Sequence, residues 1–186
     1  PDIDAHTHKY VTTGLYENKF GISNHEFDKL IEFIQKSEHI NFFGLHFHIG
    51  SQITRVEEVF SLECKRVNEI VKYFESKGLK VNNINLGGGL GVDYDDPDGN
   101  PIADFETWFK AISDNIVRRP NQNVHVEPGR SLVAQCASLI SRVLFVKSGE
   151  TKNFLIMDAG MNDLIRPALY GAYHKIENLS ATQRSF

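Results

Sequence analysis

The chain has 186 residues, of which 41% are hydrophobic and 24% charged, and its formal net charge is −4. This composition is typical of a globular protein, and the lack of excess positive charge argues against nucleic-acid or anionic-membrane partners. No run of 18 apolar residues occurs and no export signal opens the sequence, which argues against a membrane span and against secretion. We therefore expect a cytoplasmic protein.

The two cysteines, Cys64 and Cys136, lie far apart in the sequence and match no metal-binding or redox spacing. A pair of this kind fits reduced thiols better than a disulfide framework. We expect both to be core residues.

The first elements are a helix and a strand. Apolar residues at helical spacing predict a helix over residues 23–37, and Ser23 with Glu26 matches the capping-box pattern at its start. Residues 41–49 form a short apolar and aromatic run of strand length, which ends at Gly50.

The alternation of helix and strand then continues. The spacing predicts a helix over 56–74 with Gly78 as its C-cap, a strand over 81–86, a helix over 105–116 and a strand over 123–126. Strands separated by helices cannot pair as hairpins, so the sheet should be parallel. The loops after such strands share one face, where ligands bind in (β/α)₈ barrels and in open doubly wound sheets.

The pattern changes after residue 130. Residues 138–146 and 153–157 are rich in β-forming side chains, and no long helical period follows them. We expect a second domain of β type to begin between residues 131 and 137.

A glycine triplet follows the strand predicted over 81–86. Gly87, Gly88 and Gly89 lack Cβ atoms, so their backbone N–H groups could cradle a phosphate. A tight strand-to-helix turn explains such a triplet equally well when it stands alone. It is not the dinucleotide-binding fingerprint, because acidic residues follow where that motif opens a helix.

A carboxylate and a guanidinium follow the last predicted strand. Glu127 and Arg130 flank Pro128 and Gly129. An Arg beside a buried Glu suits a ligand that carries both an anionic group and a basic ring nitrogen. The alternative is an Arg–Glu ion pair that braces the loop.

His46 and His48 alternate on a predicted strand, so both side chains point to the same side. Strand histidines are more often packed or hydrogen-bonded than metal-bound, and we expect no metal site. The ring of one of them could instead stack on a flat cofactor, and Ser51 offers a hydroxyl to a phosphate. The acidic residues 93–98 fail the pattern of a calcium loop and indicate a solvated loop.

Together, four strings resemble the fold-type III pyridoxal-phosphate-dependent decarboxylases. They are HFHIGSQ at 46–52, NLGGGLG at 85–91, EPGRS at 127–131 and DAGMNDLIRPALY at 158–170. The last string is the most specific, being typical of the branch that acts on diaminopimelate, and ENKFGI at 17–22 agrees with it. The resemblance covers nearly the whole chain.

The resemblance implies an α/β fold, with part of an alanine-racemase-like (β/α)₈ TIM barrel over residues 1–133. An incomplete C-terminal β domain would follow over residues 134–186. It also implies pyridoxal 5′-phosphate (PLP) as cofactor, held at the C-terminal ends of the barrel strands. The PLP-binding residues implied are His48 at the ring, Glu127 at the ring nitrogen, and Ser51, Gly87, Gly88, Gly89, Gly129 and Arg130 at the phosphate.

The reaction implied for the full-length enzyme is decarboxylation of meso-2,6-diaminopimelate to L-lysine and CO₂, the last step of lysine biosynthesis. Arg130, Arg166 and Tyr170 would bind the substrate carboxylate. The alternatives are a sibling decarboxylase acting on carboxynorspermidine, ornithine or arginine, and a non-catalytic relative that binds PLP. The Arg166-to-Tyr170 string argues against ornithine and arginine, because a diamine-producing site need not bind a second carboxylate.

Parts of the family's catalytic site have no counterpart in this sequence. The family's Schiff-base lysine lies on an early barrel strand that would precede Pro1. Its cysteine–glutamate pair and late tyrosine, which would follow Phe186, complete the partner subunit's site in a homodimer with shared active sites. We therefore expect an internal fragment that holds no catalytic residue of its own and is inactive alone.

Overall fold

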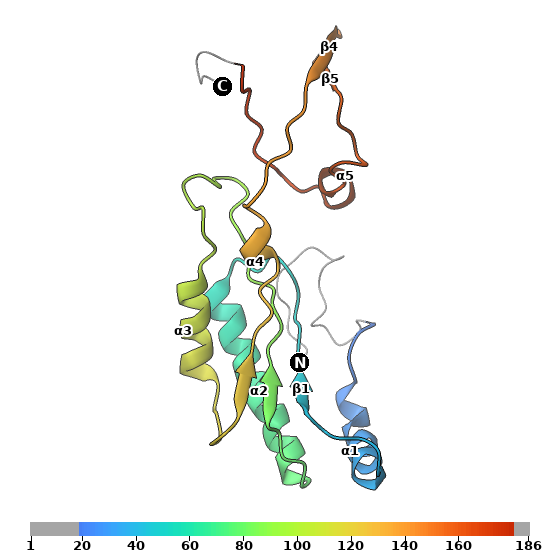
Figure 1. Cartoon of the computed structure of the whole chain (residues 1–186), viewed down its shortest axis with the longest axis vertical. Helices are drawn as coiled ribbons and strands as arrows, with labels where there is room; N and C mark the ends of the chain where they lie inside the picture. The colour runs from blue at the N-terminus through green and yellow to red at the C-terminus, as the bar shows by residue number, and fades with distance from the viewer. Residues whose placement is uncertain (1–18, 181–186) are drawn as a thin grey trace. The chain divides into compact units, whose positions relative to one another are not determined.

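The structure, a computed structural model, describes residues 19–180, so the first 18 residues of the expected barrel portion lie outside it. The chain divides into two compact units (Figure 1). The first contains the residues up to Val92 together with Ile102–Ala134, and the second contains Asp93–Pro101 together with the residues from Gln135 onward.

The first unit is built on a parallel sheet. Strands β1 (Gly44–His46), β2 (Asn83–Asn85) and β3 (Asn123–His125) pair in the order β1-β2-β3. The β-α-β-α-β order and the parallel sheet expected from the sequence are confirmed, although the strands are shorter than the apolar runs that predicted them. Hydrogen bonds between neighbouring segments continue past the strand ends, from Glu127 N to Gly87 O at 2.6 Å for example.

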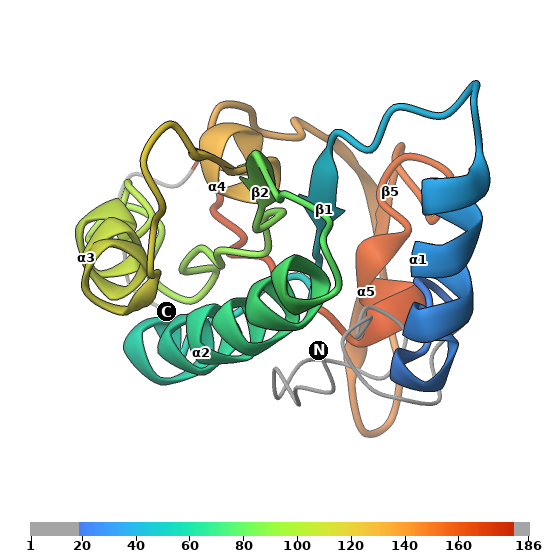
Figure 2. The same cartoon turned by 90° about the horizontal axis from the view of Figure 1, so that it is seen from below.

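Two long helices connect these strands and contact each other (Figure 2). Helix α2 (Val56–Ser76) joins β1 to β2, and α3 (Phe105–Asn115) joins β2 to β3. The rings of Phe60 on α2 and Trp108 on α3 pack against each other, with their centroids 5.5 Å apart. Each helix turns its apolar face inward, and the fully buried core includes Phe60, Val67, Phe74, Ile84, Leu86 and Trp108.

The end of α2 follows the sequence prediction. Gly78 has a φ of +87°, a left-handed conformation that glycine adopts at little cost. Its N–H donates to Glu75 O at 3.0 Å, and the N–H of Leu79 donates to Phe74 O at 3.1 Å. These two bonds form a Schellman motif, which satisfies carbonyl groups that the helix would otherwise leave unpaired.

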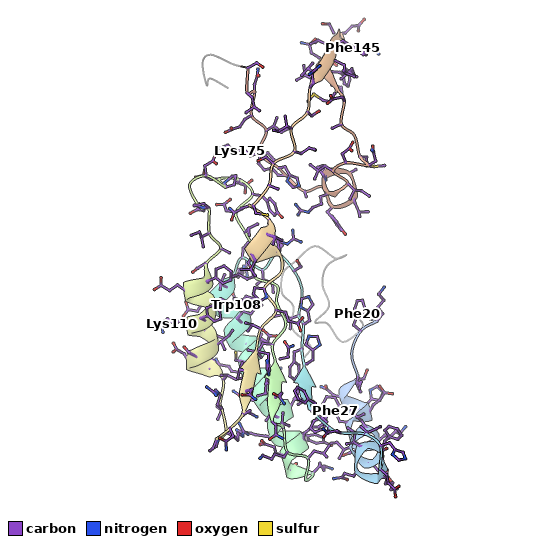
Figure 3. All side chains as sticks on the ribbon, in the orientation of Figure 1. Phe20, Phe27, Trp108, Lys110, Phe145 and Lys175 are labelled. Atoms are coloured by element: carbon purple, nitrogen blue, oxygen red, sulfur yellow. The ribbon has the colours of Figure 1, made fainter. Side chains whose placement is uncertain are left out.

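The capping box expected at the first helix is wrong. Residues Asn24–Glu26 form a 3₁₀ turn, η1, and helix α1 (Phe27–Lys36) begins after it. The Ser23 side chain makes no capping hydrogen bond, because the 3₁₀ turn pairs Glu26 N with the Ser23 backbone carbonyl instead. Helix α1 packs on the end of α2, where the Phe27 ring meets Phe74 at 5.2 Å (Figure 3).

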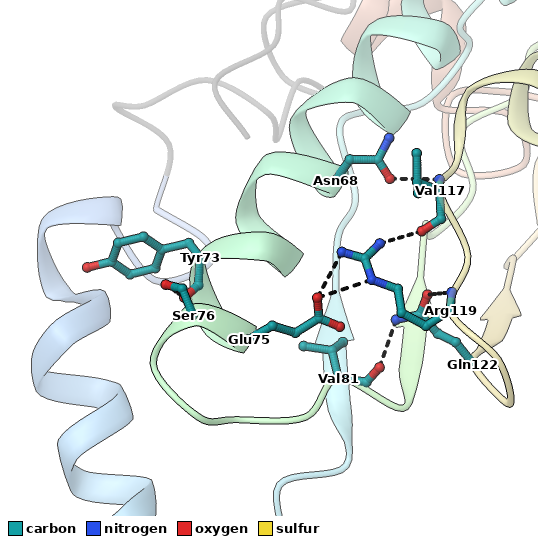
Figure 4. A network of polar contacts seen from close by, with 8 residues as sticks. All are labelled: Asn68, Tyr73, Glu75, Ser76, Val81, Val117, Arg119 and Gln122. Carbon is teal, nitrogen blue, oxygen red and sulfur yellow. Dashed lines mark hydrogen bonds and ion pairs between the residues drawn. The ribbon is translucent and has the colours of Figure 1, made fainter.

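A polar network ties the segment between α3 and β3 to α2 (Figure 4). The Arg119 guanidinium donates to Glu75 Oε2 through Nε at 3.1 Å and Nη2 at 2.8 Å. Gln122, only 2% exposed, donates to Val81 O at 2.7 Å and accepts from Arg119 N at 3.2 Å. Because buried polar groups are costly unless paired, these bonds stabilise the buried position of Gln122, the residue before β3.

The second unit contains an antiparallel hairpin and a short helix. Strands β4 (Val143–Ser148) and β5 (Asn153–Met157) pair with each other, and α5 spans Arg166–Tyr170. The apolar side chains of the hairpin are exposed, Phe145 by 59% for example (Figure 3). The loop Asp93–Pro101 joins this unit through an ion pair between Lys175 and Asp98.

The two cysteines differ in their surroundings. Cys64 lies on the inner face of α2 and is fully buried, as expected. The expectation for Cys136 is wrong, because that side chain is exposed. Cys136 lies in the second unit, three residues after the end of α4 (Arg130–Val133), and it belongs to no helix.

No helix within residues 19–180 has the length and apolar character needed to cross a membrane.

Candidate functional site

The residues singled out in the first unit follow the carboxyl ends of its three strands. His46 ends β1, and His48 and Ser51 lie in the loop after it. The glycine triplet 87–89 follows β2, and Glu127 follows β3. Since parallel strands end at the same edge of a sheet, the fold brings these three loops together as the sequence predicted.

The loops after β2 and β3 are linked through Asn85. Its side-chain amide donates to Glu127 Oε1 at 2.7 Å, and its oxygen accepts from the backbone N–H of Gly87 at 2.8 Å. One side chain thereby orients both the glycine turn and the carboxylate. Asn85 was not among the site residues expected from the sequence. Its signal there is a polar residue immediately before an apolar residue and three glycines.

The Glu127 side chain is more exposed to solvent than expected from the sequence. Its side chain is 56% exposed among the described residues, so the expectation of a buried carboxylate is wrong. The residue stands beyond the end of β3, where the sheet no longer covers it. His46 Nε2 lies 3.8 Å from Glu127 Oε1, so an imidazole and an amide both stand next to this carboxylate.

His48 is held as a neutral imidazole. Its Nδ1 accepts from the backbone N–H of Gly88 at 3.4 Å, which requires an unprotonated Nδ1. Burial lowers the pKa of His48 and nearby His46 lowers it further, while Glu127 acts in the opposite direction. The ring is therefore uncharged at neutral pH and can lie against another flat, apolar ring surface.

The glycine triplet is required by close packing between loops. A Cβ at Gly88 would overlap the carbonyl oxygen of Glu127, and one at Gly87 would overlap that of Phe47. Gly89 has a φ of +105°, and a Cβ there would come within 2.6 Å of the Gly50 oxygen. The tight-turn interpretation therefore accounts for these glycines, whether or not they also contact a phosphate.

Ser51 and Arg130 meet although they lie far apart in the sequence. The Arg130 guanidinium donates to Ser51 Oγ through Nη2 at 3.0 Å and through Nε at 3.2 Å. Since the Ser51 oxygen accepts these bonds, its O–H proton points away from Arg130 and can be donated to another group. The pair presents a positive charge and an O–H donor together, which suits an anionic group.

The other expected substrate residues belong to the second unit. Arg166 begins α5 and Tyr170 ends it, and Gly171 follows in the left-handed conformation with a φ of +60°. The Arg166 guanidinium carbon lies 4.5 Å from the centre of the Tyr94 ring, and Nη1 lies 3.0 Å from His174 Nε2. Neither neighbour was among the site residues expected from the sequence.

The acidic loop is exposed at Asp95, Asp96 and Asp98, as expected of a solvated loop, and hydrogen bonds hold its turn. The Asp93 carboxylate accepts from the backbone N–H groups of Asp95 and Asp96 at 2.8 and 2.9 Å. Asn100 also donates to it at 2.9 Å. Over the part of the chain that the structure describes, no three His, Cys, Asp or Glu residues gather as metal ligands.

The groups of the first unit suit a flat cofactor that carries a phosphate and a ring nitrogen. A neutral imidazole, His48, offers a ring face. A carboxylate, Glu127, is oriented by Asn85 at 2.7 Å and can hold a proton on a basic ring nitrogen. The Ser51–Arg130 pair and the backbone N–H groups of the glycine turn are suited to a phosphate.

The chain matches a known family over most of its length. Residues 1–134 match the family described as "Pyridoxal-dependent decarboxylase, pyridoxal binding domain". The diaminopimelate decarboxylase of Bacteroides thetaiotaomicron is 50% identical over 183 residues, which are 98% of this chain and 47% of that protein. That of Neisseria meningitidis serogroup B is 41% identical over 177 residues, which are 95% of this chain and 42% of that protein.

Solved structures agree with these sequence relatives. Diaminopimelate decarboxylase from Helicobacter pylori, complexed with L-lysine, has a TM-score of 0.83 at 36% identity, over 94% of this chain and 43% of that one. The fold expected from the sequence, part of a barrel followed by part of a β domain, is confirmed. The chain spans less than half the length of these relatives.

Proposed function

Since this chain belongs to the pyridoxal-dependent decarboxylases and matches their pyridoxal-binding domain, we propose that its full-length protein converts meso-2,6-diaminopimelate into L-lysine and CO₂. The observation that carries this proposal is the convergence of His48, Glu127 and the Ser51–Arg130 pair after three adjacent parallel strands. The identity of 50% to a curated diaminopimelate decarboxylase supports the choice of substrate.

The PLP-binding residues proposed are those that the sequence indicated. His48 would lie against the pyridine ring, and Ser51, Gly87, Gly88, Gly89, Gly129 and Arg130 would surround the phosphate. When bound, PLP supplies an electron sink for the electrons released as the carboxylate leaves as CO₂.

Glu127 would hold a proton on the pyridine nitrogen. A carboxylate next to that nitrogen favours the protonated form, since opposite charges at close range stabilise each other. The hydrogen bond from Asn85 at 2.7 Å fixes one carboxylate oxygen and leaves the other for this contact.

Substrate binding would fall to Arg130, Arg166 and Tyr170. A planar guanidinium can donate two parallel hydrogen bonds to a carboxylate, which sets orientation as well as affinity. Diaminopimelate carries a carboxylate at each end, so one must be held while the other leaves. Such residues favour it over substrates with a single carboxylate.

We assign residues 1–133 to the barrel and residues 134–186 to the start of the β domain. The compact units differ from this assignment mainly at the loop Asp93–Pro101, which groups with the second unit. The catalytic lysine, the cysteine–glutamate pair and the late tyrosine would belong to other parts of the full-length protein. That protein would be a cytoplasmic homodimer whose subunits share their active sites.

The test is an absorbance spectrum of the purified full-length protein with PLP, followed by addition of meso-diaminopimelate and measurement of CO₂. Cofactor absorbance with CO₂ release supports the proposal. Absorbance without CO₂ release rejects this substrate, and the same assay with carboxynorspermidine, ornithine and arginine then identifies a sibling activity. A protein that binds PLP and releases CO₂ from none of them is a non-catalytic relative.

Glu127→Gln tests the role of the carboxylate in the same protein. The amide keeps the shape but cannot balance a positive charge on the ring nitrogen. We expect kcat to fall by at least about tenfold, which corresponds to ~1.4 kcal/mol, while the Kd for PLP changes by less than about threefold. An unchanged kcat would remove Glu127 from the mechanism.

A further inference from the structure

The Arg166 side chain in the second unit is held from two sides. Its guanidinium carbon lies 4.5 Å from the centre of the Tyr94 ring, and Nη1 lies 3.0 Å from His174 Nε2. The Tyr94 and His174 rings also meet each other edge to face, with centroids 5.2 Å apart. All three residues are half-buried, and Tyr94 is 72 residues before Arg166 in the sequence (166 − 94).

The contact with His174 requires a neutral ring. An arginine side chain only donates hydrogen bonds, so His174 Nε2 must accept and cannot carry a proton. Burial lowers the pKa of His174 and the positive charge of Arg166 lowers it further, which keeps the acceptor available at neutral pH. Protonation would instead place two positive charges side by side.

Tyr94 reaches Arg166 because the loop that carries it is anchored on both sides. Lys175, next to His174, forms an ion pair with Asp98, and Gln135 donates to the carbonyl of Asn100 at 2.8 Å. The Asp93 carboxylate holds the turn through two backbone N–H groups. The ring therefore lies in a fixed loop.

These contacts leave most of the guanidinium available. Arginine has five N–H donors, and within residues 19–180 the Arg166 side chain has one hydrogen-bond partner, His174. A flexible arginine loses rotamer entropy when a ligand fixes it. An arginine fixed beforehand by a ring face and an imidazole avoids much of that loss.

We propose that Tyr94 and His174 are positioning residues that hold the Arg166 guanidinium ready for a carboxylate of the substrate. The inference rests on the proposed function, since it assigns Arg166 to substrate binding. Tyr94 and His174 thereby favour a substrate with two carboxylates, although neither side chain need touch it.

The experiment uses the full-length protein and measures kcat and KM for meso-diaminopimelate, with the Kd for PLP and the thermal midpoint as checks on folding. Tyr94→Leu removes the ring face and His174→Leu removes the acceptor. We expect each to raise KM about tenfold with kcat changed less than about threefold, because the contact contributes to binding before and during the reaction alike.

Conservative variants separate positioning from general damage. Tyr94→Phe keeps the ring face and His174→Gln keeps an acceptor atom, so each should recover most of the lost affinity. Tyr173→Leu is the matched control, since this neighbouring tyrosine is 56% exposed, and its KM should stay within about twofold of the wild type.

The outcomes separate the two proposals. A wild-type protein that releases no CO₂ from diaminopimelate overturns the proposed function and this inference with it. If Arg166→Met raises KM while Tyr94→Leu and His174→Leu do not, Arg166 binds substrate but the positioning role is wrong. If one leucine variant fails to fold, the other leucine variant is compared with the conservative variant at the same position. Equal KM values for these two variants would overturn the inference.

Discussion

Glu63 offers a sharp test of how burial affects the stability of the first unit. It lies on the inner face of α2 and is 1% exposed, and its Oε1 has no hydrogen-bond partner among the described residues. Burial raises the pKa of this carboxyl to about 8. We expect Glu63→Gln to stabilise the protein at neutral pH.

The magnitude follows from the difference between the folded and unfolded states. The folded carboxyl has a pKa of about 8 and the unfolded one an ordinary value of 4.5. Between these values the folded state binds more protons, so stability falls as pH rises. Since pH 7 lies ~2.5 pH units above the unfolded pKa, the buried carboxyl lowers the free energy of unfolding at pH 7 by about 3 kcal/mol. Glutamine does not titrate, so the variant does not lose this stability.

The assay is denaturant unfolding of the full-length protein and of the Glu63→Gln variant at several pH values from 4.5 to 8. The advantage of the variant should be near zero at pH 4.5 and should grow to about 3 kcal/mol at pH 7. The control is Glu57→Gln on the exposed side of the same helix, which should change stability by no more than ~0.5 kcal/mol at any of these pH values. An advantage that does not vary with pH would refute the reasoning.

Two further predictions concern packing and the polar network. Gly88→Ala, whose new Cβ would overlap a backbone carbonyl, should lower the free energy of unfolding by at least ~2 kcal/mol. Gly129→Ala, where nothing lies within 4 Å of the added atom, should lower it by less than ~1 kcal/mol; equal losses would contradict the packing argument. Arg119→Ala breaks a partly buried, two-bond ion pair and should cost ~1–3 kcal/mol in thermal or denaturant unfolding. Arg66→Ala, in an exposed pair on α2, should cost less than ~1 kcal/mol, and an equal cost for both would show that the network adds nothing.

Much of the first unit could be predicted because its signals are local. Apolar spacing of three and four residues defined α2 and α3, and Gly78 marked the end of α2. Helices between strands required a parallel sheet, which placed the loops after β1, β2 and β3 at one edge. The prediction failed at Ser23. A capping box and a 3₁₀ turn differ in whether the N–H of Glu26 donates to the side chain or to the backbone carbonyl of Ser23, and here it donates to the carbonyl.

The family resemblance, the parallel sheet and the loops that carry His48, Ser51 and Glu127 were determined by the sequence itself. Only the tertiary structure decided that Asn85 orients Glu127 and that Tyr94 and His174 hold Arg166. The reason is physical: periodicity and turn chemistry depend on neighbouring residues. A contact between side chains 42 or 72 positions apart exists only once the intervening chain has folded.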